Sequence, residues 1–241
     1  MNDFIEVGKV KEIWRYPVKS MAGEALQEAD IYWHGINGDR RAAFVRGDND
    51  SGFPWLTARQ IPQINQYRPR YTDLTDVVNS DLVVETPNGE TLPLGSPALQ
   101  AELADLYGHD VSLIRIKRGV FDDLPLSMIS VASANALAEA ADIPVDVRRW
   151  RQNIIIETFD GRSFTEEEWV GQTVTIGDVQ FNLNIRIPRC VMVNVDPETA
   201  VKNPDVLKMV ANTRSNCVGV AGTPASIGTI RVGDVVRVIG V

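Results

Sequence analysis

Short stretches of alternating polar and apolar residues, rich in β-branched and aromatic side chains, recur along the whole of this 241-residue chain. Because successive side chains of a strand face opposite sides of a sheet, each stretch predicts a strand with one buried face. The clearest stretches are Val7–Tyr16, Asp81–Glu85, Val111–Ile116, Asn153–Glu157, Val174–Leu183 and Thr229–Ile239. Tight reversals are predicted at the turn-forming pairs Asn88-Gly89, Asp160-Gly161, Gly177-Asp178 and Gly233-Asp234.

Helical spacing of apolar residues is restricted to three stretches, Ser96–Tyr107, Ser130–Ala141 and Asn203–Asn212. Each opens with a serine or asparagine, which are residues that cap the first turn of a helix. Pro144 ends the second stretch, because a proline disfavours a helical residue before it and donates no hydrogen bond.

Many strands and few helices predict a β-rich α+β protein. We expect two packed β-barrel-like domains with a few short helices, because closure of a sheet leaves no open edges. A turn at Lys117-Arg118-Gly119 separates the halves. We therefore expect an N-terminal domain over residues 1–116 and a second domain over residues 117–241.

Charge and composition narrow the range of partners and compartments. The net charge of −8 provides no broad cationic surface for a phosphate backbone, so we expect no nucleic acid partner. The N-terminal residues contain no apolar signal segment, and no apolar run is long enough to span a bilayer. We expect no membrane contact and a cytoplasmic location, with which the presence of only two cysteines agrees.

Cys190 is the first candidate for chemistry, because it ends an apolar strand directly after Arg189. A neighbouring cation favours the thiolate, the form that attacks substrates or binds metals. The alternative is a buried cysteine that acts as a small hydrophobic residue, and this interpretation applies more strongly to Cys217, which lies in a predicted interior strand. His34 and His109 lack ligand spacing, so a zinc site or a Ser-His-Asp triad has little support.

Lys19 and Ser20, together with Arg40, are candidates for binding a phosphate. Both segments follow predicted strands, and Arg offers a planar fork of donors where Lys offers a point charge. The alternative is that both segments are solvated turns whose side-chain stems lie along the surface. Neither segment matches a P-loop.

Three arginines around Trp150 form a third cationic segment, Arg148-Arg149-Trp150-Arg151. Concentrated positive charge in an acidic protein suggests an anionic ligand. Intramolecular pairing with the acidic run at residues 166–168 is the alternative. Asp122 is a candidate for acid–base or ligand chemistry, although a turn before Pro125 is the simpler interpretation.

Taken in order, these segments resemble the superfamily of the molybdenum-cofactor-sulfurase C-terminal (MOSC) domain with its N-terminal β-barrel companion. This group includes the mitochondrial amidoxime-reducing component. The resemblance covers nearly the whole chain. Its segments are Tyr16-Pro-Val-Lys-Ser20 with Gly23, Gly38-Asp-Arg40, Thr57-Ala-Arg-Gln60, Ser130-Val-Ala-Ser133, Arg149-Trp-Arg-Gln-Asn153, Glu168-Trp-Val-Gly171, Arg189-Cys190 with Val195-Asp-Pro197, and Gly228 to Asp234.

The resemblance implies a role for each candidate residue in holding a molybdenum cofactor, a Mo-pterin. In the family, the strand cysteine before a Val-Asp-Pro turn ligates molybdenum or carries persulfide sulfur, and this role falls on Cys190. Lys19, Ser20 and Arg40 are similar to residues that grip the pterin phosphate or its surroundings. Arg151 and Asn153 resemble residues on the opposite side of the cofactor, and Asp122 is similar to a family acid close to the metal.

The implied activity is reduction of N-hydroxylated small molecules with electrons from a separate ferredoxin-like or cytochrome-like protein. We expect a separate donor because the chain ends soon after Asp234, without a four-cysteine ferredoxin extension, and because it begins without a membrane anchor. A persulfide carrier or cofactor-delivery module that uses Cys190 is the alternative, and a plain interaction barrel is a third reading. Two positions depart from the family pattern, Leu124 in place of a small polar residue and Gln152 in place of a common proline.

Overall fold

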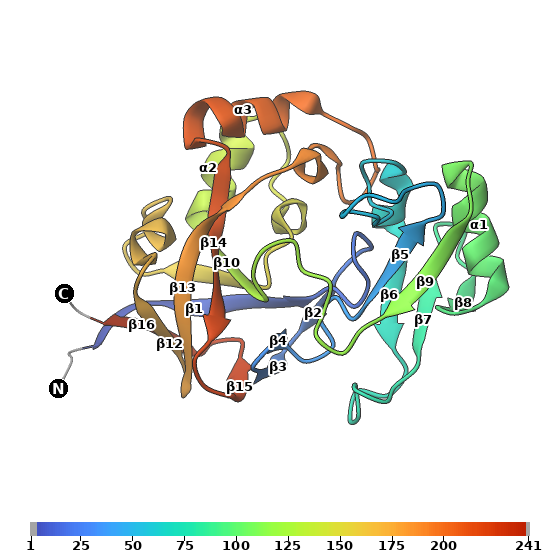
Figure 1. Cartoon of the computed structure of the whole chain (residues 1–241). Helices are drawn as coiled ribbons and strands as arrows, with labels where there is room; N and C mark the ends of the chain where they lie inside the picture. The colour runs from blue at the N-terminus through green and yellow to red at the C-terminus, as the bar shows by residue number, and fades with distance from the viewer. Residues whose placement is uncertain (1–3, 240–241) are drawn as a thin grey trace.

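The computed structural model describes residues 4–239, and its largest element is an eight-stranded sheet that closes on itself (Figure 1). The strand order is β11-β10-β14-β13-β12-β16-β1-β2, and pairing of β11 with β1 closes seven of these strands into a barrel. The strands are β1 (Phe4–Arg15), β2 (Glu24–Leu26), β10 (Leu126–Ser130), β11 (Ile154–Thr158), β12 (Thr173–Ile176), β13 (Val179–Pro188), β14 (Cys217–Pro224) and β16 (Val235–Ile239).

Alternation of side chains fills the barrel interior. Along β13 the apolar residues Val179, Phe181 and Leu183 are buried, while the polar residues between them are exposed. Strands β1, β12 and β16 contribute their own alternate apolar residues to the same core. The sequence pattern of period two therefore corresponds to the inner and outer faces of the barrel wall.

Smaller sheets surround a second core, on the right of Figure 1. Strand β5 (Ala42–Arg46) pairs with β9 (Val111–Arg115), and β6 (Arg68–Tyr71), β7 (Leu82–Glu85) and β8 (Thr91–Pro93) form a three-stranded sheet. The second core includes Phe44, Tyr67 and Leu99, all almost fully buried. A further sheet joins β3 (Glu28–Tyr32) to β4 (Gly35–Ile36) and β15 (Gly228–Arg231).

The predicted helices are present and their caps are the predicted residues. They are α1 (Pro97–Tyr107), α2 (Val131–Ala140) and α3 (Pro204–Arg214). The side chains of Ser96, Ser130 and Asn203 each accept a hydrogen bond from a backbone N–H in the first turn. Helices α2 and α3 cover a third core on the outside of the barrel.

Four short 3₁₀ helices lie in the loops of the described residues: η1 (Pro62–Gln66), η2 (Val147–Trp150), η3 (Thr165–Trp169) and η4 (Val191–Asn194). Of these, η2 immediately precedes Arg151, and η4 immediately follows Cys190. These one-turn helices place two of the candidate residues at their ends.

The expectation of a β-rich α+β protein with few helices is confirmed by this architecture. The division at residues 116 and 117 stays a prediction, and strand pairing crosses it, because β1 pairs with both β11 and β16 and β3 pairs with β15. Over residues 4–239, no helix combines the length and the apolar character that crossing a membrane requires.

Candidate cofactor site between the two cores

A cavity of about 320 Å³ lies where loops of the N-terminal half meet the ends of β10 and β13. This volume is in the range of small-molecule and cofactor sites. Of the residues singled out from the sequence, Lys19, Ser20, Arg40, Asp122, Arg151 and Cys190 all line this cavity. Five separate segments of the chain therefore meet at one place.

Cys190 lies just beyond the end of β13, at the residue that precedes the one-turn helix η4. Its side chain is free and exposed. The alternative of a buried cysteine acting as a small hydrophobic residue is therefore wrong for Cys190. The backbone before it is fixed, because Arg189 N–H donates to Asn216 O at 2.8 Å and Asn216 Nδ2 donates to Arg189 O at 2.9 Å.

Lys19 presents a buried cation to the cavity. Its Nζ donates to Asp122 Oδ1 at 2.5 Å and to the Val120 carbonyl oxygen at 3.3 Å. Burial lowers the pKa of the Lys19 ammonium, and the Asp122 carboxylate opposes this shift. Lys19, a candidate for binding phosphate, and Asp122, a candidate for acid–base chemistry, are thus hydrogen-bonded partners in the cavity wall.

Two guanidinium groups of the cavity wall pack against the ring of Tyr16. The guanidinium carbons of Arg40 and Arg151 lie 4.9 Å and 4.4 Å from the centre of the Tyr16 ring. Burial raises the pKa of Tyr16 to about 12, so the ring remains a neutral phenol at physiological pH. Arg40 also donates to the Arg151 carbonyl oxygen at 3.1 Å, and Arg151 donates to Asn65 Oδ1 at 3.1 Å.

Arg189 adds a further cation beside the thiol. Its Nη2 donates to the Trp150 carbonyl oxygen at 2.8 Å. Burial lowers the pKa of this guanidinium, and the neighbouring Cys190 opposes the shift. An arginine remains charged at neutral pH despite such a shift, so the cavity carries Lys19, Arg40, Arg151 and Arg189 as positive groups.

Backbone conformation also distinguishes this cavity. Ser20, Arg40 and Arg151 have φ angles of 66°, 49° and 54°, in the left-handed region that favours glycine. Each such residue costs about 1–3 kcal/mol and persists where its surroundings determine it, often at functional sites. Three lining residues with this strain support a functional site, in which the position of the side chains is kept at the expense of backbone strain.

Ser20→Gly is expected to raise the free energy of unfolding by about 1 kcal/mol, because glycine adopts a positive φ without the steric penalty. Urea denaturation measures this change. Ser112→Gly is the matched control, because Ser112 lies in strand β9 without such strain and its replacement should destabilise the protein. If both variants lose stability equally, Ser20 is not strained.

Asn153 lies behind the cavity and is not among the residues that line it. Its Nδ2 donates to the Trp14 carbonyl oxygen at 3.1 Å, and its Oδ1 accepts from Ser127 Oγ at 3.0 Å and from Arg40 at 3.4 Å. Its contact with a cofactor stays a prediction. In the structure its side chain contacts Arg40 and so helps to position that guanidinium.

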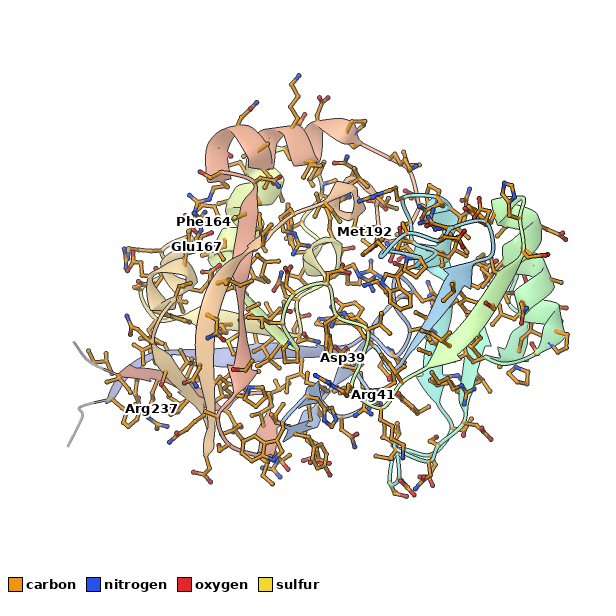
Figure 2. The ribbon with its side chains drawn as sticks, viewed as in Figure 1. Asp39, Arg41, Phe164, Glu167, Met192 and Arg237 are labelled. Carbon is orange, nitrogen blue, oxygen red and sulfur yellow. The ribbon has the colours of Figure 1, made fainter. Side chains whose placement is uncertain are left out.

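The three arginines around Trp150 do not pair with the acidic run at residues 166–168, so that alternative is wrong. Arg148 pairs with Asp146 and Glu198, and Arg149 pairs with Asp196. Glu167 instead pairs with Arg186 and Arg214, and Figure 2 shows it beside Phe164 and well apart from Met192 at the cavity. Nearness in sequence was a poor guide, because η3 contacts β10 and β14 whereas η2 contacts α2 and η4.

The sequence assigned no role to Phe53, Thr57 and Arg59, which line the cavity from the N-terminal half. Thr57 and Arg59 belong to the Thr57-Ala-Arg-Gln60 segment, which is part of the family resemblance. That motif could have identified them as site residues. Phe53 lies in an irregular loop and carried no signal.

The cavity wall also contains buried polar atoms that have no hydrogen-bond partner in the described structure. They are the Nε of Arg189 and the Oε1 of Gln152. A buried polar group without a partner is costly, and a polar ligand would satisfy it. Together with four cations and one exposed thiol, these atoms fit an anionic, polar cofactor that contains a thiol-binding metal.

Comparisons with known proteins agree with this arrangement. Residues 115–237 match the family model of the MOSC domain, and residues 7–115 match that of the MOSC N-terminal beta barrel domain. The chain is 26% identical to mitochondrial amidoxime-reducing component 1 of Homo sapiens, over 98% of this chain and 84% of that protein. It is 24% identical to mitochondrial amidoxime reducing component 2 of Bos taurus, over 95% of this chain and 82% of that protein.

Among solved structures, the YUAD protein from Bacillus subtilis superimposes with a TM-score of 0.54 at 11% identity, over 99% of this chain and 98% of that one. This likeness supports the fold. The MOSC family is associated with the molybdenum cofactor, and the relatives support a function related to it. With its domain matched over half of the sequence, the chain belongs to the MOSC domain family.

Proposed function

We propose that the protein binds a molybdenum cofactor in the cavity where its N-terminal half meets the barrel and reduces N-hydroxylated small molecules. The observation that carries this proposal is the exposed thiol of Cys190 at the wall of a cavity that also presents Lys19, Arg40, Arg151 and Arg189. A thiolate is a soft ligand that suits a metal of this kind, and the cations suit a phosphate.

The donor set fits a metal that arrives already chelated by a pterin. Cys190 offers one thiolate, and among residues 4–239 no three His, Cys, Asp or Glu side chains lie close enough together to hold a metal ion between them. When bound, such a cofactor supplies two-electron redox chemistry that no side chain of the protein performs. Arg40 would hold its phosphate, with Lys19 and Ser20 beside it, and Arg151 and Gln152 would face its polar edges.

Asp122 would handle protons at the mouth of the cavity. Its Oδ1 accepts from Lys19 Nζ, and its side chain is 55% exposed, so it has access to both solvent and a ligand. Release of water from an N-hydroxylated substrate consumes protons, and a carboxylate close to a buried ammonium is suited to relay them. Asn153 would act through Arg40 and not on the substrate directly.

The electrons would come from a separate ferredoxin-like or cytochrome-like protein, and the cytoplasm would be the compartment. The two curated relatives named above carry amidoxime reduction in their names, which favours this substrate class. A persulfide carrier is the second candidate, because an exposed thiol beside cations is also suited to accept and transfer sulfur.

Cys190→Ala should lower the molybdenum content at least about tenfold, because loss of a direct ligand exceeds the usual effect of an outer contact. The protein is produced in a host that makes the cofactor, and the metal is measured by mass spectrometry. Cys217→Ser is the matched control, because Cys217 begins β14 outside the cavity lining and should leave the metal unchanged.

Activity separates the two candidate functions. Reduction of benzamidoxime with a viologen as electron source, lost in Cys190→Ala, would support the reductase. Cyanide-releasable sulfur on Cys190, in a protein without molybdenum, would support the carrier. Equal molybdenum in wild type and Cys190→Ala would contradict the assignment of Cys190 as the ligand.

A further inference from the structure

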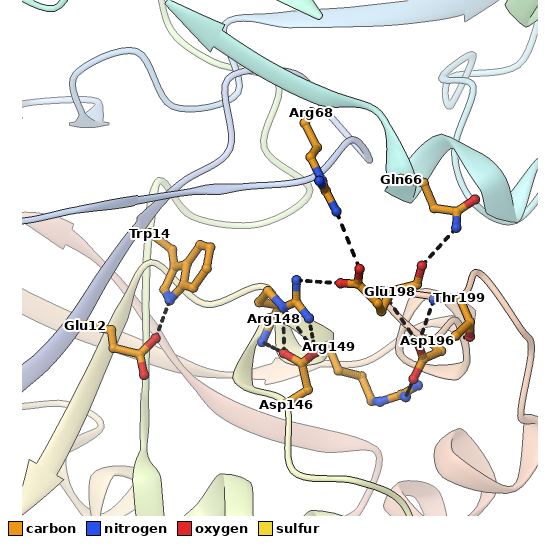
Figure 3. A network of polar contacts seen from close by, with 10 residues as sticks. All are labelled: Glu12, Trp14, Gln66, Arg68, Asp146, Arg148, Arg149, Asp196, Glu198 and Thr199. Carbon is orange, nitrogen blue, oxygen red and sulfur yellow. Dashed lines mark hydrogen bonds and ion pairs between the residues drawn. The ribbon is translucent and has the colours of Figure 1, made fainter. Parts of the chain in front are cut away.

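Three arginines fasten the segment that carries Cys190 to the one-turn helix η2. Arg148 and Arg149 reach from η2 to Glu198 and Asp196, and Arg189 reaches back to the Trp150 carbonyl oxygen. We name this set of contacts the arginine buckle. Figure 3 shows the first two of these contacts and the neighbouring Arg68 and Gln66.

Arg149 is the most buried member of the buckle. Its side chain is 3% exposed, and its Nη2 donates to Asp196 Oδ2 at 2.6 Å. Its Nη1 donates to the Val193 carbonyl oxygen at 3.2 Å. Val193 lies in η4, and Cys190 is the residue that caps that helix at its N-terminal end. One guanidinium therefore holds both the short helix after Cys190 and the Val-Asp-Pro turn that follows.

Asp196 is organised to receive this contact. Its Oδ1 accepts from the backbone N–H groups of Glu198 at 3.1 Å and Thr199 at 2.9 Å. Hydrogen bonds from these groups and the charge of Arg149 hold the pKa of the Asp196 carboxyl below its usual range, despite partial burial. The carboxylate therefore remains charged toward Arg149 at neutral pH.

Glu198 extends the buckle to the other half of the molecule. Its carboxylate accepts from Arg148 at 3.1 Å and lies 3.5 Å from Arg68, and its carbonyl oxygen accepts from Gln66 Nε2 at 2.9 Å. Met192 and Val195 on the same segment pack against the second core. The segment from Cys190 to Glu198 is thus fixed between the second and third cores, because Val193 belongs to the third.

These bonds join the segment that carries Cys190 to the segment that carries Arg151. Helix η2 ends immediately before Arg151, which lines the cavity, and η4 begins immediately after Cys190, which also lines it. Arg149 connects the two helices, and the residues adjacent to these helices at the cavity are Arg151 and Cys190. Two apolar side chains would hold the segments together without desolvating charges, but would not fix one relative position as a planar fork does.

We propose that Arg149 and Asp196 are positioning residues for Cys190, which set the placement of its sulfur relative to the cations of the cavity. This proposal rests on the proposed function. It links two segments that the sequence analysis named separately, because Arg149 of the Arg149-Trp-Arg segment binds Asp196 of the Val-Asp-Pro turn.

Arg149→Met tests the proposal, with Arg149→Lys as the conservative variant. Arg162→Met is the matched control, because Arg162 also makes two side-chain contacts, with Asp160 and Glu168, but is 59% exposed and is not among the residues that line the cavity. Three quantities are measured in the full chain: amide hydrogen exchange over residues 190–196, molybdenum content, and the electron paramagnetic resonance spectrum of Mo(V).

Arg149→Met should accelerate exchange over residues 190–196 about tenfold, because hydrogen bonds to a charged group are lost. Molybdenum content should fall about tenfold, as is typical when a contact behind a metal ligand is removed. Arg149→Lys should recover part of the metal, since an ammonium reaches Asp196 but lacks the fork for two acceptors. The Mo(V) spectrum of Arg149→Lys should differ from that of wild type, and the spectrum of Arg162→Met should not.

Two results would overturn the proposal while leaving the proposed function intact. One is wild-type exchange in Arg149→Met. The other is faster exchange with unchanged metal content and an unchanged spectrum, which would make the buckle structural only. Wild-type protein without molybdenum would instead contradict the proposed function, and this proposal with it.

Discussion

Asp39→Ala is expected to lower the free energy of unfolding by about 3–5 kcal/mol, the usual effect of removing one partner from a buried ion pair. Asp39 is 0% exposed, and Figure 2 shows it near the centre of the molecule. Its Oδ1 accepts from the Tyr16 backbone N–H at 2.7 Å, and its Oδ2 pairs with Arg40. Alanine would leave the buried Tyr16 N–H without an acceptor and the Arg40 cation without its countercharge. Urea denaturation measures the loss of stability.

Two further variants separate the causes. Asp39→Asn keeps an acceptor for the Tyr16 N–H but not the charge, so its loss of stability should be intermediate. Asp105→Ala is the exposed control on helix α1 and should stay within about 0.5 kcal/mol of wild type. A loss below about 1 kcal/mol in Asp39→Ala would contradict a structural role for the Asp39–Arg40 pair.

Trp150→Ala is expected to lower the free energy of unfolding by about 3–5 kcal/mol as well, through a different cause. Trp150 is 1% exposed and packs in the third core with residues of α2, α3 and β11. Alanine would leave a cavity that the surrounding helices and strand only partly fill. Because Trp150 ends η2, the change would also loosen the attachment of Arg151.

Trp33→Ala is the control for this prediction, because Trp33 is 65% exposed between β3 and β4. Its replacement should change stability by no more than about 0.5 kcal/mol. Equal losses in the two tryptophan variants would show that burial in the third core is not the source of the effect.

Strands with one buried face were predictable from sequence, whereas strand β10, in which every residue is buried, was not. The alternation in β1, β7 and β13 was visible because their side chains alternate between more buried and more exposed positions. All five residues of β10 (Leu126–Ser130) are buried, so no period of two exists in that segment. Its pairing between β11 and β14 is a property of the closed barrel and not of its own residues.

The cavity residues were predictable as members of motifs, but their partners were not. Cys190, Lys19 and Arg40 carried a signal because each follows a strand in a family-like segment. The pairing of Arg149 with Asp196 joins positions 47 residues apart, and the sequence favoured nearer acids. The positive φ angles of Ser20, Arg40 and Arg151 had no signal either, because none of them is a glycine.

Strand β1 lies between β11 and β16 and pairs Phe4 with Ile239, so the earliest described strand is flanked by the latest one. During synthesis the ribosome must release the C-terminal strand before this ring is complete. Contacts between such distant positions slow folding, because a long loop must close before they form. Until then β1 and β12, the two strands that pair with β16, expose unpaired edges, and a nascent chain in this condition is a natural client for chaperones.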